Sequence, residues 1–105
     1  MGQGTRPMTP DSFKNTIREP APPERLSPVL EALWWAAKGD WNRAHVLVQD
    51  DPSRDAAWVH AYLHRVEGDL GNAGYWYRTA GRAAASDSLE VEWQTIVAAL
   101  LAGGR

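Results

Sequence analysis

The chain has 105 residues and a formal net charge of −2 at pH 7, with 11 lysines and arginines against 13 aspartates and glutamates. This length suffices for one domain with a modest core, and the charge gives no general attraction to nucleic acid or to an anionic membrane. The chain contains no cysteine, which excludes disulfides, thiolate nucleophiles and zinc–thiolate sites.

The N-terminal segment, residues 1–25, differs in composition from the rest of the chain, because six of the seven prolines lie at or before Pro28. We interpret it as an extended, partly disordered arm with a short helix over about residues 10–18. Phe13 and Ile17 share one face of that helix. Either the arm packs these two side chains over one end of the domain, or it docks on another protein.

The remaining residues, 26–105, are predicted to form one helical domain, because apolar residues recur at helical spacing between turn signals. The predicted helices span about 28–38, 41–50, 53–67, 70–80 and 88–102. The last helix has an apolar stripe, and we expect it to cap the open side of the two helices before it, about 53–67 and 70–80.

A short pattern occurs twice: Ala32, Gly39, Asp40 and Ala44 recur 29 residues later as Ala61, Gly68, Asp69 and Ala73. A fixed period of this size is typical of a repeated supersecondary unit. Glycine commonly ends a helix in the left-handed conformation, and the aspartate that follows can cap the next helix. We therefore predict two helix–turn–helix hairpins, about 27–50 and 53–80.

These hairpins resemble the tetratricopeptide repeat (TPR) and its relatives. The second copy has small or aromatic residues where that family has them, at Ala61, Gly68, Asp69, Ala73, Tyr77 and Ala80. The first copy departs from the pattern at Asp51-Pro52, and the period is 29 residues instead of the family's 34. Over about residues 29–81, the resemblance implies an all-α fold with a right-handed stack of two antiparallel repeats. The chain also resembles a small group of uncharacterised bacterial proteins.

The TPR resemblance also implies a concave binding face. Transferred position by position, that face contains Leu33 in the first copy and Trp58, Tyr62 and Arg65 in the second. The leading hypothesis is therefore a non-enzymatic module without a cofactor, which binds a protein or peptide or forms a homodimer. The alternative at these positions is that Trp58 and Tyr62 belong to the core.

The histidines suggest a second hypothesis. His60, His64 and Glu67 are spaced i, i+4 and i+7, so they share one face of a helix, and His45 on the preceding helix can face them. Two histidines and a carboxylate at this spacing can ligate a metal ion. The chain would then be a small metal- or ligand-binding protein, with or without catalytic activity. The alternative is that these histidines are hydrogen-bonded or solvated.

No nucleophile motif or glycine-rich phosphate loop is found in the sequence, so we do not expect an enzyme that depends on either. The first ten residues lack the apolar segment of a secretory signal, and no apolar run reaches the ~20 residues of a membrane-spanning helix. We therefore expect a cytoplasmic protein with no membrane contact.

Overall fold

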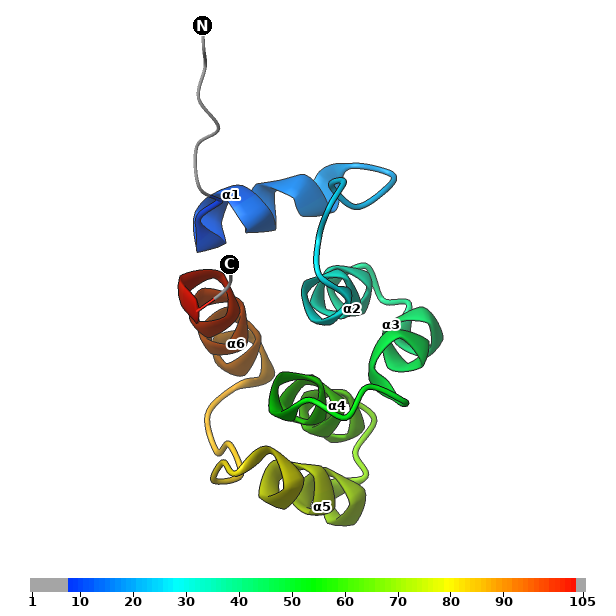
Figure 1. Cartoon of the computed structure of the whole chain (residues 1–105), viewed down its shortest axis with the longest axis vertical. Helices are drawn as coiled ribbons and strands as arrows, with labels where there is room; N and C mark the ends of the chain where they lie inside the picture. The colour runs from blue at the N-terminus through cyan, green and yellow to red at the C-terminus, as the bar shows by residue number, and fades with distance from the viewer. Residues whose placement is uncertain (1–7, 104–105) are drawn as a thin grey trace, which may run out of the picture.

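The structure is a computed structural model that describes residues 8–103, and all of the regular secondary structure in that range is helical. The prediction of an all-α fold is thus confirmed. Figure 1 shows the elements, which in chain order are α1 (Pro10–Asn15), the 3-10 helix η1 (Thr16–Arg18), α2 (Pro28–Ala37), α3 (Trp41–Val48), α4 (Arg54–Val66), α5 (Leu70–Ala80) and α6 (Leu89–Gly103).

Both predicted glycine–aspartate turns are present and join α2 to α3 and α4 to α5. Gly39 and Gly68 have φ angles of +86° and +87°, the left-handed region in which glycine carries no steric penalty. The side chains of Asp40 and Asp69 accept hydrogen bonds from backbone N–H groups in the first turn of the following helix. The same local chemistry therefore builds two hairpins.

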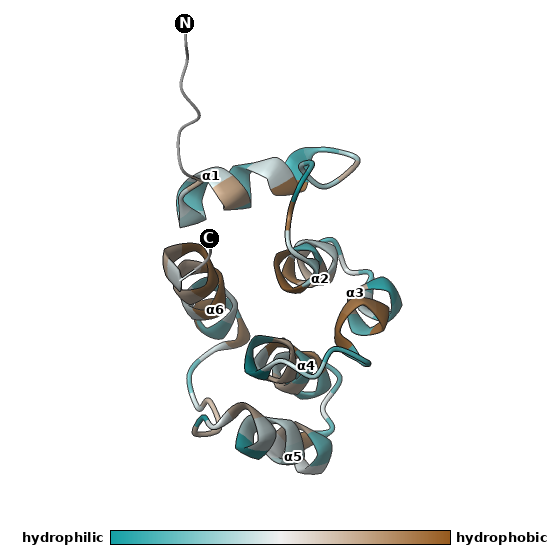
Figure 2. Cartoon of the chain, in the orientation of Figure 1, coloured by the Kyte–Doolittle hydropathy of each residue, from teal (hydrophilic) through white to brown (hydrophobic). Residues whose placement is uncertain are grey.

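The two hairpins lie side by side, with α3 of the first packed against α4 of the second. Helix α6 returns to pack on α1, α2 and α4, so that α2 and α4 lie between α6 and α3 (Figure 1). Figure 2 shows much of the hydrophobic ribbon on α2, α3 and α6. The cap predicted for the second hairpin thus extends over both hairpins.

The N-terminal segment contributes to the core. Phe13 on α1 is fully buried, and its ring centroid lies 5.8 Å from that of Trp93 on α6. The indole N–H of Trp34 donates to Thr16 Oγ1 over 3.0 Å, which ties η1 to α2. The helix predicted over residues 10–18 is therefore present as α1 and η1, and it packs on the domain. Residues 1–7 of the predicted arm lie outside the described residues.

Helix α4 occupies the centre of the molecule. Nine consecutive residues, from Ala56 to His64, are buried, because α2, α3, α5 and α6 all pack around this helix. A helix enclosed in this way buries its polar side chains together with its apolar ones, and His60 and His64 are among them. None of the helices within residues 8–103 has the length and apolarity needed to cross a membrane.

Candidate functional site

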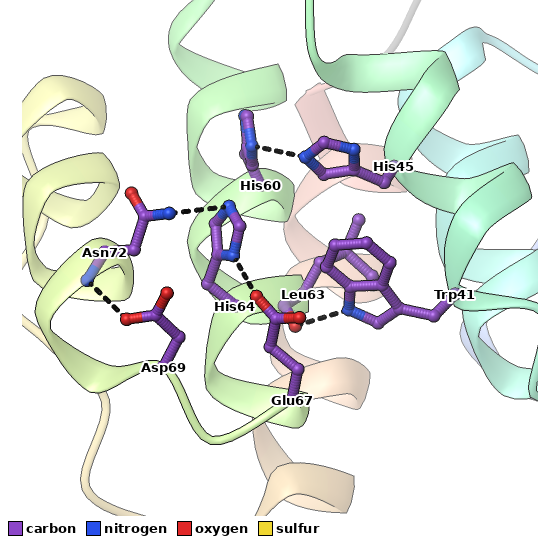
Figure 3. A network of polar contacts seen from close by, with 8 residues as sticks. All are labelled: Trp41, His45, His60, Leu63, His64, Glu67, Asp69 and Asn72. Atoms are coloured by element: carbon purple, nitrogen blue, oxygen red, sulfur yellow. Dashed lines mark hydrogen bonds and ion pairs between the residues drawn. The ribbon is translucent and has the colours of Figure 1, made fainter.

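The three histidines of the chain come together between α3, α4 and α5. His45 comes from α3, and His60 and His64 come from successive turns of α4 (Figure 3). His60 and His64 are buried and His45 is half-buried. Each of the three offers a ring nitrogen, and these atoms lie within 4.8 Å of one another. The structure therefore brings together the residues of the histidine hypothesis.

The closest contact in this cluster joins the two hairpins. His45 Nε2 lies 3.0 Å from His60 Nε2, with the two rings nearly perpendicular. Two neutral imidazoles can make this contact only when one nitrogen carries a proton and the other presents a lone pair. The other ring nitrogen of His60, Nδ1, is buried and has no hydrogen-bond partner among the described residues. His60 is thus incompletely satisfied, although buried polar groups in proteins are usually paired.

A carboxylate orients the ring of His64. Its Nδ1 lies 2.6 Å from Glu67 Oε2, so the N–H at Nδ1 donates to the carboxylate. That tautomer leaves a lone pair on Nε2, toward which the side-chain amide of Asn72 on α5 points over 3.4 Å. An imidazole whose Nδ1–H is held by a carboxylate presents Nε2 as a ligand, the arrangement that commonly supports metal-binding histidines.

Burial and mutual repulsion keep the other two imidazoles neutral. The pKa of His60 is lowered from 6.5 to about 4, mainly by burial and to a smaller extent by the nearby His45 and His64. Burial is also the main cause that lowers the pKa of His45, with a further contribution from His64. At neutral pH both rings are therefore uncharged, and an uncharged imidazole has the lone pair that a metal ion requires.

Two tryptophans cover the faces of the histidine rings. Trp41 stacks on His45 with ring centroids 4.6 Å apart, and Trp76 stacks on His60 at 4.0 Å. The indole N–H of Trp41 donates to the backbone carbonyl of Leu63, which fixes that ring against α4 (Figure 3). The tryptophans restrict how the imidazoles can turn and shield the cluster from water.

Sequence reasoning did not identify Trp41, Trp76 or Asn72 as part of this site. Trp41 precedes His45 by four residues, a spacing that places both on one helix face and could have revealed the stack. Trp76 and Asn72 reach the histidines across the α4–α5 interface. Their spacing in the sequence gives no signal for that contact.

The positions predicted to line a concave binding face lie under α6. The exposed fractions of Leu33, Trp58 and Tyr62 are 0%, 5% and 7%. Arg65 is held by Glu92 of α6, with Nη1 and Oε1 2.8 Å apart. In the described structure, these four residues therefore form part of the packing between α6 and the hairpins, and only Trp58 and Tyr62 also contribute to the lining of surface pockets.

Comparisons with known proteins gave no match. No family model, no curated protein and no solved structure matches the chain. The function is therefore inferred from the geometry of the site alone.

Proposed function

We propose that the protein binds a divalent transition-metal ion, zinc or nickel, through His45, His60 and His64. The observation that supports this proposal most directly is the convergence of three ring nitrogens within 4.8 Å in a buried cluster. The cluster joins two hairpins, and its members come from positions 15 and 4 residues apart in the sequence. A metal ion would be coordinated by the Nε2 atoms of His45 and His60, which share one proton in its absence.

The distances suit such an ion. Zinc holds imidazole nitrogens at about 2.0–2.1 Å in a tetrahedral arrangement, which places two ligand nitrogens about 3.4 Å apart. The Nε2 atoms of His45 and His60 are 3.0 Å apart, so a small separation of the rings would admit the ion. The third nitrogen lies within 4.8 Å of the other two, so it would have to move inward by up to about 1.4 Å to complete the set.

The chemistry of the ligands selects the class of metal. Neutral imidazoles favour zinc, copper, iron and nickel, whereas magnesium and calcium prefer oxygen ligands. Glu67 was a candidate ligand in the sequence-based hypothesis. Its contact with His64 Nδ1 favours a different role, in which the carboxylate orients the ring and balances part of the ion's charge.

A TPR-like right-handed stack remains our proposal for the relation between the two hairpins. It is supported by the repeated glycine–aspartate turn and by the packing of α3 against α4. In such a stack, the second helix of one repeat lies beside the first helix of the next. His45 would meet His60 as a consequence of the repeat itself.

A role as a peptide-binding module is supported less well. Leu33, Trp58 and Tyr62 are buried, so a peptide could reach them only after α6 had left α2 and α4. That displacement would also expose Trp93 and break the contact between Arg65 and Glu92. We therefore prefer metal binding, which uses the packed form of the molecule.

Metal binding is tested by equilibrium dialysis of the metal-free protein against Zn²⁺ and Ni²⁺, with elemental analysis of the protein as purified. We expect one ion per chain. Losing a residue that only supports a ligand typically weakens metal binding about 10- to 100-fold. His64→Ala removes a ligand itself, so it should weaken binding by more than this. Because His64 is buried, replacing it also removes packing in the core. His45→Ala, at a half-buried position, therefore serves as a second variant.

Asp55→Asn provides the matched control, because Asp55 is an exposed carboxylate on α4 outside the histidine cluster. It should bind metal as the wild type does, and circular dichroism should show the same helical content for all variants. The proposal is wrong if wild-type protein takes up neither ion, or if the folded histidine variants bind as tightly as wild type.

A further inference from the structure

The proposed site supplies three ligands, one fewer than a tetrahedral ion needs. Within residues 8–103, the other acidic side chains that cluster with one of these histidines are Glu67 and Asp69, which lie near His64. Sites with three protein ligands keep a fourth position for water or substrate, whereas purely structural zinc sites are closed by a fourth side chain. The identity of the fourth ligand therefore decides what the site can do.

Glu67 lies on the wrong side of His64 to be that ligand. The two nitrogens of an imidazole point away from each other across the ring, so a single ion can be reached by only one of them. Glu67 is hydrogen-bonded to Nδ1, and the ion would be held by Nε2. The ring of His64 then stands between the carboxylate and the ion, as Figure 3 shows for its two nitrogens.

The side chain of Asp69 already serves as the N-cap of α5. Its carboxylate caps α5 by accepting a hydrogen bond from the backbone N–H of Asn72 over 3.1 Å. If the carboxylate left that position, α5 would lose its N-terminal cap. Neither carboxylate is therefore placed to complete the coordination of an ion at the three histidines.

The edge of the histidine cluster retains some exposure to solvent. His45 is half-buried, Asn72 is exposed, and the side chain of Glu67 is 39% exposed. Trp41 and Trp76 cover the faces of two imidazoles, so a ligand from solution could reach an ion only past their edges. Three neutral imidazoles carry no charge, and Glu67 balances only part of the charge of a divalent ion, which favours an anion at the fourth position.

We infer that the metal ion takes its fourth ligand from solution, as a water molecule that exchanges with small monovalent anions. This inference rests on the proposed function, because it requires an ion at His45, His60 and His64. The inference adds that one coordination position of the ion is open, and that small monovalent anions bind there.

The test uses the protein loaded with Co²⁺, whose visible absorption reports the number and kind of its ligands, and titration with sodium azide. We expect a saturable shift of the absorption bands as azide replaces water. Sodium perchlorate of the same ionic strength, whose anion coordinates metal ions very weakly, is added in parallel, so that a general salt effect is subtracted.

Glu67→Gln is the informative variant, because it retains the shape of the side chain and removes the charge. If Glu67 orients His64, the variant should bind Co²⁺ about 10- to 100-fold more weakly, with the same bands and the same azide response. If instead azide shifts the bands only in Glu67→Gln, Glu67 is the fourth ligand and the inference is overturned.

The two proposals fail in different ways. Absence of stoichiometric Co²⁺ binding would remove the proposed metal site itself. Stoichiometric binding with bands that azide does not change, in both wild type and Glu67→Gln, would retain the metal site and overturn the open position. The latter result would show that the coordination of the ion is closed to exogenous anions.

Discussion

Glu90 and Glu92 on α6 are two residues apart in the sequence and have opposite environments. Glu92 is 3% exposed and accepts hydrogen bonds from the Arg65 guanidinium and from the Tyr77 hydroxyl. Burial and this hydrogen bond to Glu92 raise the pKa of Tyr77. Glu90 is exposed and lies 3.5 Å from Lys14, a pair in which both side chains face solvent. The two carboxylates should therefore contribute very differently to stability.

We expect Glu92→Ala to lower the free energy of unfolding by about 3 kcal/mol, because it leaves Arg65 and Tyr77 without their partner. Glu90→Ala removes a surface ion pair and should cost less than about 1 kcal/mol. Urea denaturation of both variants measures the difference through the transition midpoint. Equal losses for the two variants would show that Glu92 does not tie α6 to the hairpins.

At this scale, the sequence was sufficient for part of the site. Helical spacing alone predicted that His60, His64 and Glu67 share a face, and that His45 can meet them. The same spacing could not predict that Glu67 would hold Nδ1 of His64, because the choice of nitrogen depends on the rotamer of the ring. Tertiary packing decided that Leu33 and Tyr62 are core residues.

At the scale of secondary structure, Gly68 in the turn before α5 and Gly74 inside α5 have different backbone conformations. Gly68 has a φ of +87°, which an L side chain adopts only with strain, and the space around it is open. Gly74 lies inside α5 with ordinary helical geometry, and an added Cβ would lie 3.5 Å from Arg78 Nη1. A glycine within a helix is expected where a neighbouring backbone or an aromatic ring leaves no space for a Cβ atom. At Gly74 neither is close enough to exclude one.

We expect Gly68→Ala to destabilise the protein by about 1 kcal/mol through backbone strain alone. Gly74→Ala should stabilise it by about 0.5–1 kcal/mol, because alanine loses less conformational freedom in a helix. Thermal unfolding followed by circular dichroism gives both signs in one experiment. Stabilisation by Gly68→Ala would mean that the turn does not hold its left-handed glycine.

The helices were predictable because their signals are local. Caps such as Ser27 and Asp69, and the glycines between paired helices, act on neighbouring residues. The docking of α6 was predictable only in part. Its apolar stripe predicted a buried face, but the sequence did not indicate that this face would pack on α2 as well as on α4. That outcome depends on contacts between residues far apart in the chain, such as Trp93 with the carbonyl of Leu33.

At the scale of the whole molecule, the histidine cluster is a junction between the two hairpins. His45 belongs to the first hairpin and His60 to the second, and their contact spans the α3–α4 interface. In the metal-free protein, burial at this junction opposes protonation of His45 and His60. The stability of the fold should therefore depend on pH over the range in which histidines titrate.

We expect metal-free protein to lose stability as the pH falls from about 6.5 towards 4. In the unfolded chain His60 binds a proton near pH 6.5, but in the folded protein its lowered pKa delays protonation until about pH 4. The unfolded state thus binds more protons within this window, and acidification favours it. The loss attributable to His60 is on the order of 3 kcal/mol over the full window.

The measurement is the free energy of unfolding in urea between pH 7 and pH 5, in the presence of a chelator, because most carboxylates stay ionised above pH 5. His60→Gln cannot titrate, so its stability should vary less over the same range. A parallel series with Zn²⁺ should raise stability most at pH 7, where protons do not compete for the ligands. Equal slopes for wild type and His60→Gln would mean that His60 is not held neutral by the α3–α4 junction, and the neutral cluster on which metal binding depends would lose its support.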